Sequence, residues 1–424
     1  MAASAAACTD RATSPTSPSE LRTPANNATT STSDRRSSAP ATLAWAARGR
    51  ALVLAHPATM SPIVATRAYG LMGMTMYGAA VAADRSLGIT DADGDRSTVT
   101  GADEGGRAQY EARRGAIGAA SARILSYLFP DAVDAIKAQL AAEGIGANGR
   151  THPQFTRGVR IGEAVGTLMV EWGKADGLDV TWTNPPFTPW LPGTPGRWYQ
   201  TPGSLLTGAA GFQFPGMRPY MLRSNDQFRP APPPAYLSPA FNAGLKVVRD
   251  ISDTRTAEQT AIANFWNFSV GTTSTLGYWD ERAAEYIAQH DLGERSAAHV
   301  FALTNAAVLD ATIGCWDAKY QYGLLRPTQA DGGITLVFPL PNHPSYPSGH
   351  SCLSAAAVTV LSAFFPEKAA ELETGLTNAG LSRIYAGIHY PFDISAGQAL
   401  GRSAGAWALD YDRRKGVLHA VGQE

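Results

Sequence analysis

Apolar residues recur at helical spacing along most of the chain, and no alternating strand pattern of useful length interrupts them. Apolar side chains three or four positions apart predict amphipathic or buried α-helices. The expected helices cover residues 43–84, 107–129, 132–143, 156–173, 240–250, 256–268, 278–290, 296–325, 352–364, 367–379 and 392–413. The predicted fold class is therefore all-α.

Two stretches depart from this pattern. Residues 1–42 are rich in Ala, Ser, Thr, Pro and Asn and lack aromatic residues, which predicts disorder. Residues 178–239 are dense in Pro, Gly and aromatic residues, and these aromatic side chains need burial, so we expect a long ordered loop that lines a site or wraps the helices. The rest is predicted to be one helical domain over 43–424, with halves at 43–177 and 240–424.

Composition and charge limit the classes of binding partner that we expect for the chain. The chain has 424 residues and a net charge of −1 at pH 7, which gives no reason to expect affinity for nucleic acid or an anionic membrane surface. No run of 18 apolar residues occurs, so we predict no membrane-spanning helix. Cys8, Cys315 and Cys352 are too few for a disulfide framework. We expect Cys315 and Cys352 to be buried thiols, although a bridge between them stays open.

The start of the chain bears on localisation. It lacks the apolar core of a signal peptide, although Ala5-Ala6-Ala7-Cys8 resembles the end of a lipoprotein signal. We predict a soluble protein. It would be exported or lipid-anchored if the true N-terminus is longer, and cytoplasmic otherwise.

Three segments of the C-terminal half carry a concentrated set of cations, histidines and one carboxylate. They are Lys319 with Arg326; Pro347-Ser348-Gly349-His350; and Ser382-Arg383 with His389 and Asp393. Cationic side chains bind multiply charged anions, and arginine presents a forked pair of donors. The set predicts an oxyanion pocket.

The first segment is expected on one helix. Lys319 and Arg326 are seven residues apart, which is nearly two helical turns, so both would leave the same face. Pro327 would then end that helix, because proline cannot continue the hydrogen-bond ladder.

The other two segments are each expected at a helix start. Ser348 and Gly349 precede a long apolar run, and a helix start offers free N–H groups and a positive dipole end to an anion. Asp393 would lie in the first turn of a further helix. From there its carboxylate can accept from the Nδ1–H of His389, which leaves Nε2 free.

The order, spacing and identities of these residues resemble the vanadium-dependent haloperoxidases and the related type-2 phosphatidic acid phosphatase superfamily, in a soluble bacterial haloperoxidase-like branch. The likeness extends to residues 224–234 and 256–266 and is good from about Pro62 onward. It implies two four-helix bundles packed into one domain, with the site in the C-terminal bundle.

The resemblance implies a vanadate cofactor, for whose site phosphate competes. The oxyanion would be held by Lys319, Arg326, Ser348, Gly349 and Arg383. His389 would be the coordinating or covalent histidine, paired with Asp393, and His350 the acid–base histidine. Lys319 would also polarise bound peroxide.

Two enzymatic activities are implied by the same residues. With vanadate, hydrogen peroxide would oxidise halide to hypohalous acid, which halogenates a small organic acceptor. With a phosphate ester, His389 would form a phosphohistidine, as in an acid phosphatase. A non-catalytic oxyanion-binding protein is a third interpretation, although every motif position is filled. A homo-oligomer is left open.

Two further positions bear on the halide. The resemblance places His343 and Trp316 beside the halide site, and histidine at position 343 favours bromide or iodide over chloride. The alternative for His343 is a loop histidine bonded to the backbone, and the alternative for Trp316 is a packing residue.

One departure from the family pattern follows Phe265-Trp266. An aspartate that pairs with the arginine at position 383 is expected there, but the chain continues Asn267-Phe268-Ser269. Arg383 would then be less firmly oriented, which would alter the affinity for vanadate.

Overall fold

The computed structural model describes residues 39–89, 104–146, 149–178, 193–200 and 209–423. Within these ranges the regular structure is helical, with two isolated β-bridges and no strand, which confirms the all-α class. Most of the stretch predicted to be disordered lies outside the described residues, as does part of the predicted 178–239 loop.

The N-terminal half contains α1 (Pro40–Ala55), α2 (Pro62–Ser86), α4 (Glu104–Leu128), α5 (Val133–Gly144) and α6 (Pro153–Lys174). The single helix expected over 43–84 is thus two helices. Proline begins both α1 and α2, where its missing N–H would have no partner anyway. Ser61 caps α2 by accepting from the N–H of Val64 at 3.4 Å.

The C-terminal half contains α7 (Pro239–Thr254), α8 (Ala257–Phe265), α9 (Ser274–Gln289), α10 (Glu294–Tyr322), α11 (Pro327–Ala330), α12 (Gly349–Phe364), α13 (Ala369–Tyr385) and α14 (Pro391–Lys415). Short 3-10 helices lie at Pro130–Ala132, Phe214–Gly216, Pro366–Lys368 and Val417–Val421.

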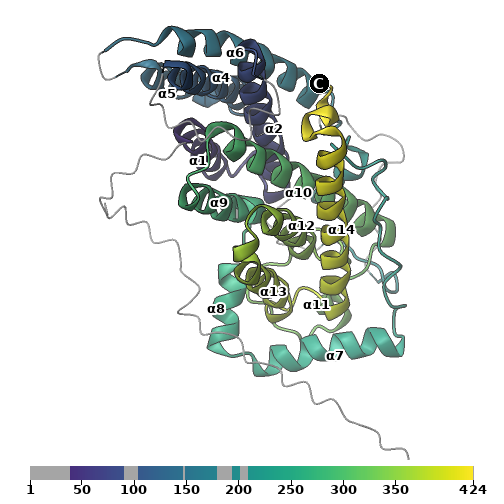
Figure 1. Cartoon of the computed structure of the whole chain (residues 1–424). Coiled ribbons are helices and arrows are strands. Elements are labelled where there is room, and N and C mark those ends of the chain that lie inside the picture. The colour runs from purple at the N-terminus through teal and green to yellow at the C-terminus, as the bar shows by residue number, and fades with distance from the viewer. Residues whose placement is uncertain (1–38, 90–103, 147–148, 179–192, 201–208, 424) are drawn as a thin grey trace, which may run out of the picture.

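Helix α10 lies between two groups of helices (Figure 1). It packs on α2, which contacts α4 and α6, and on α12 and α14, which contact α13. The arrangement into two four-helix bundles remains a prediction.

Among the described helices, α10 alone has the length and composition of a membrane span, and 94% of its apolar window is buried inside the structure. Polar residues such as Asn305 and Asp310 interrupt its apolar run, which is why counting consecutive apolar residues did not single it out.

A disulfide joins α10 to α12, so the expectation of two buried thiols was wrong. Cys315 and Cys352 are fully buried, and their Cα atoms lie 6.4 Å apart, within the usual span of a disulfide. The bond ties the helix that carries Lys319 to the helix that begins at Gly349. Sequence alone could not show it, because the bond depends on how these two helices pack.

Candidate active site

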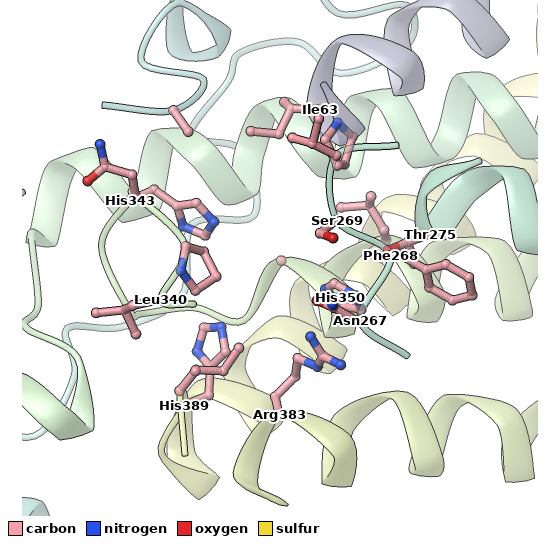
Figure 2. Close-up of a pocket in the computed structure, with 18 of the residues that line it drawn as sticks. Ile63, Asn267, Phe268, Ser269, Thr275, Leu340, His343, His350, Arg383 and His389 are labelled. Carbon is pink, nitrogen blue, oxygen red and sulfur yellow. The ribbon is translucent and has the colours of Figure 1, made fainter. Parts of the chain in front are cut away.

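The structure gathers all the residues predicted for the site. Those that line a cavity of about 130 Å³ are Trp316, His343, Gly349, His350, Arg383 and His389. Figure 2 shows the histidines and Arg383 around this space. We call Trp316, His343, Gly349, His350 and Arg383 the outer set. Behind them lies the inner set, which is fully buried: Lys319, Arg326, Ser348 and Asp393. His389 lies between the two sets.

The second motif opens α12, as predicted. Ser348 is the residue before the helix, and Gly349 is its first residue. The Ser348 hydroxyl is buried and has no hydrogen-bond partner among the described residues. A Cβ at Gly349 would lie 3.0 Å from the Trp316 ring, so glycine makes room for the indole at this helix start. An unpaired hydroxyl beside a helix N-terminus suits an anion.

His389 is held at both ring nitrogens. Nδ1 lies 2.8 Å from Oδ2 of Asp393, and Nε2 lies 2.9 Å from Nη1 of Arg326. A guanidinium can only donate, so Nε2 is the acceptor and Nδ1 carries the proton. The contact with Asp393 is the one expected, but Nε2 is not free. Burial, followed by the charges of Arg326 and Lys319, holds the pKa of His389 well below its ordinary value.

Arg326 reaches the site from a loop, so its prediction on a helix face was wrong. Helix α10 ends where Gly323 takes a left-handed conformation with φ of 57°, before Arg326 is reached. The Arg326 guanidinium also donates to the carbonyl groups of His343 at 3.0 Å and Ile388 at 2.8 Å. Burial lowers the pKa of Arg326 to about 10, so it stays charged at neutral pH.

Lys319 supports the loop before α12. Its ammonium donates to the carbonyl groups of Pro344 and Ser345, both at 2.9 Å, and to that of Pro347. These contacts use all three ammonium protons. Burial and the nearby charge of Arg326 lower the pKa of Lys319 well below 10.5. Lys319 therefore acts from behind the cavity.

Arg383 has no carboxylate partner among the described residues. Its Nε donates to the hydroxyl of the preceding serine at 2.9 Å, and its Nη2 donates to the carbonyl groups of Ala263 at 3.3 Å and Trp266 at 2.6 Å. Backbone carbonyls thus orient Arg383 where the family pattern led us to expect an aspartate near Ser269. Burial lowers its pKa to about 9.

His350 shares the Trp266 carbonyl with Arg383. Its Nε2 lies 2.9 Å from that oxygen, so in the neutral ring Nε2 carries the proton and Nδ1 is an acceptor. The ring stacks on Phe268 with centroids 6.4 Å apart. Phe268 has a positive φ of 34°, which is uncommon for a residue with a side chain. Burial, followed by the charge of Arg383, holds the pKa of His350 well below 6.5.

His343 and Trp316 pack together at the cavity wall, with ring centroids 5.2 Å apart. Nδ1 of His343 accepts from Nη2 of Arg326 at 3.0 Å. Trp316 is anchored through Nε1, which donates to the carbonyl of Ala210 at 2.9 Å. His343 is therefore both a hydrogen-bonded loop residue and a cavity residue.

Two contributors to the site were not predicted from the sequence. The Ser345 hydroxyl donates to Oδ2 of Asp393 at 2.6 Å. Its place between His343 and Pro347 is the signal that could have found it. The Trp266 carbonyl is the other, and a backbone group carries no sequence signal.

The remaining cavity wall is mainly carbon. It includes Ile63, Phe268, Phe338, Leu340, Leu353 and Ile388. Its volume of about 130 Å³ is well above the ~10–15 Å³ that one water molecule needs. The polar groups of the site thus meet a small cavity with an apolar side.

The C-terminal part of the chain matches a known family. Residues 297–416, which include every motif residue above, match the model of the PAP2 superfamily. This part of the chain therefore carries the sequence pattern of that superfamily. A curated relative, an undecaprenyl-diphosphatase from Sulfolobus acidocaldarius, is 36% identical over 87 residues. That match covers 20% of this chain and 41% of the relative, so the chain spans less than half the length of the relative.

Solved structures resemble the chain over most of its length. A bacterial vanadium-dependent iodoperoxidase has a TM-score of 0.69 at 25% identity, over 88% of this chain and 96% of that one. The apo and holo forms of a bacterial vanadium-dependent chloroperoxidase have TM-scores of 0.66 and 0.64, both at 15% identity. They cover 86% and 87% of this chain and 96% and 95% of theirs, and they show the fold alone. Together these matches support an enzyme.

Proposed function

We propose that this PAP2 enzyme is a vanadate-dependent haloperoxidase, which oxidises iodide or bromide with hydrogen peroxide and halogenates a small organic acceptor. The observation that carries the proposal is the state of His389. Its proton is on Nδ1, and its Nε2 lone pair points at a cation, beside a helix start.

The donors present fit a tetrahedral oxyanion. The buried Ser348 hydroxyl needs a partner, and the first turn of α12 offers free N–H groups. Three buried cations (Lys319, Arg326 and Arg383) match the several negative charges of vanadate or phosphate. The fit supports a bound oxyanion at His389.

The inner set, together with Arg383 and the N–H groups at the start of α12, would bind and orient the cofactor. Vanadate, when bound, supplies a Lewis acid that activates hydrogen peroxide. His389 would hold it through Nε2 once Arg326 donates to an oxyanion oxygen instead. Asp393 keeps the proton on Nδ1 of His389, and Lys319 adds positive charge from behind.

The two histidines and Trp316 of the outer set would move protons and admit substrates. His350 has an unprotonated Nδ1 and a lowered pKa, so it can accept a peroxide proton at neutral pH. His343 and Trp316 would border the halide. His343 and the 25% identity with an iodoperoxidase support iodide or bromide. The carbon wall supports an apolar acceptor.

Hydrolysis of a phosphate ester is the second candidate function. The match to an undecaprenyl-diphosphatase favours it, and the carbon wall would suit an apolar leaving group. Nε2 of His389 would attack phosphorus, and His350 in its protonated form would donate a proton to the leaving oxygen.

The disulfide supports a location. A buried disulfide persists in oxidising compartments and is rare where thiols are kept reduced. We therefore propose a soluble protein that works outside the reducing cytoplasm.

A paired assay on one metal-free sample tests the function. One half is loaded with orthovanadate and given peroxide with iodide, bromide or chloride, and the other half is given a phosphate ester. We expect vanadate-dependent oxidation of iodide and bromide. Hydrolysis alone, blocked by vanadate, would establish the phosphatase, and no activity in either half would overturn both.

A further inference from the structure

Ser345 connects three parts of the site. It is fully buried in the loop before α12. Its N–H donates to the carbonyl of Leu324 at 2.9 Å, and its carbonyl accepts from Lys319 at 2.9 Å. Its hydroxyl donates to Oδ2 of Asp393 at 2.6 Å. Two of these three contacts, those with Lys319 and Asp393, therefore reach residues of the oxyanion site.

The Asp393 carboxylate depends on this hydroxyl. Oδ2 accepts from Ser345, from Nδ1 of His389 at 2.8 Å and from the N–H of Tyr390 at 3.2 Å. Oδ1 has no partner among the described residues. His389 and Tyr390 lie within four residues of Asp393 in the sequence. Of these three donors, only Ser345 comes from a distant part of the chain.

We propose that Ser345 is a positioning residue, whose hydroxyl fixes the Asp393 carboxylate so that Oδ2 stays on the Nδ1–H of His389. The consequence for the cofactor rests on the proposed function, because it assumes that Nε2 of His389 meets the oxyanion. Groups that orient a ligating histidine typically change metal affinity or activity by about 10- to 100-fold when they are removed.

The test compares Ser345→Ala with Ser345→Thr, which keeps a hydroxyl, and with Ser354→Ala as the matched control. Ser354 is equally buried, and its Oγ accepts from Nε1 of Trp279 at 3.0 Å, away from Asp393. If Ser345→Ala does not fold, Ser345→Cys replaces it, because a thiol is only a weak donor.

Two readouts are needed. The first is NMR of the His389 ring in the metal-free protein, assigned with His389→Ala, which follows the exchange of the Nδ1 proton with water. We expect exchange to be about tenfold faster in Ser345→Ala, because the carboxylate that binds this proton is less fixed. The second is the dissociation constant of orthovanadate, which we expect to rise by about tenfold. Ser345→Thr should restore both values.

The outcomes separate the two proposals. If wild-type protein does not bind vanadate, the proposed function fails while the proton-exchange readout still tests Ser345. If Ser345→Ala keeps the exchange rate of the wild type and of Ser354→Ala, the positioning role is overturned. The same conclusion follows if vanadate binds Ser345→Ala and Ser354→Ala equally well.

Discussion

The inner and outer sets of the site are built in different ways. In the inner set, Lys319 and Arg326 are fully buried. Lys319 donates hydrogen bonds to backbone carbonyls, and Arg326 donates to backbone carbonyls and to histidine ring nitrogens. In the outer set, His350 and His343 face the cavity and are only partly buried. This difference indicates that the inner set is organised in advance for charge, whereas the histidines of the outer set are placed to exchange protons and substrates.

His350→Ala should have the largest effect, and it should lower turnover without lowering the affinity for vanadate. It removes the acid–base group but leaves the inner donors in place, so turnover should fall by about 100- to 10,000-fold. The affinity for orthovanadate should stay within about threefold of wild type, because His350 bonds to the Trp266 carbonyl and not to the inner set. Steady-state kinetics and a binding titration check this. A parallel loss of vanadate affinity would contradict the division.

Arg326→Ala should have the opposite effect. It removes a charged fork and leaves His389 and His343 each without a donor, so the affinity for orthovanadate should fall by about 100-fold. Arg402→Ala is the control, since this half-exposed arginine pairs with Glu373 at the surface. If both variants bind vanadate as the wild type does, Arg326 is not part of the oxyanion site.

Removing the disulfide should weaken the framework common to both sets. Cys315→Ala combined with Cys352→Ala deletes a bond across 37 residues, so the free energy of unfolding should fall by about 2–4 kcal/mol. Denaturant titration under non-reducing conditions measures this. An unchanged midpoint would show that the cysteines do not bridge in the purified protein.

Asp280 lies outside both sets, and its effect on stability depends on pH. It is buried and, among the described residues, has one hydrogen bond, from Nδ2 of Asn305 at 3.3 Å, and burial raises its pKa to about 7. Between its unfolded value, about 3.9, and pH 7 the folded state binds the proton more tightly. This contribution to stability therefore declines as pH rises through that window.

The matching variant is Asp280→Asn, which cannot ionise. Its melting temperature should be close to that of wild type near pH 4 and higher above pH 7. A constant difference across this range would rule out Asp280 as the titrating group.

Local features of the site could be predicted from the sequence. Asp393 and His389 are four residues apart at a helix start, so their contact depends on nearby backbone alone. The start of α12 at Gly349 is equally local. Both follow from proline position and apolar periodicity.

Features that depend on packing or on one backbone angle could not be predicted. Arg326 was predicted on the same helix face as Lys319. Gly323 ends α10 before Arg326 is reached, so the two residues do not share a helix. The Ser345–Asp393 hydrogen bond spans 48 residues, and the carbonyl partners of Arg383 have no side-chain signal. These contacts form only when α8, α13 and the loop before α12 pack together.

The most direct test of the account is a calorimetric titration of orthovanadate into metal-free wild-type protein and into His389→Ala, with phosphate as competitor. We predict one vanadate per chain, displaced by phosphate, and no measurable binding to the variant. Equal binding by both proteins, or no binding by the wild type, would contradict the claim that His389 and the inner set hold an oxyanion.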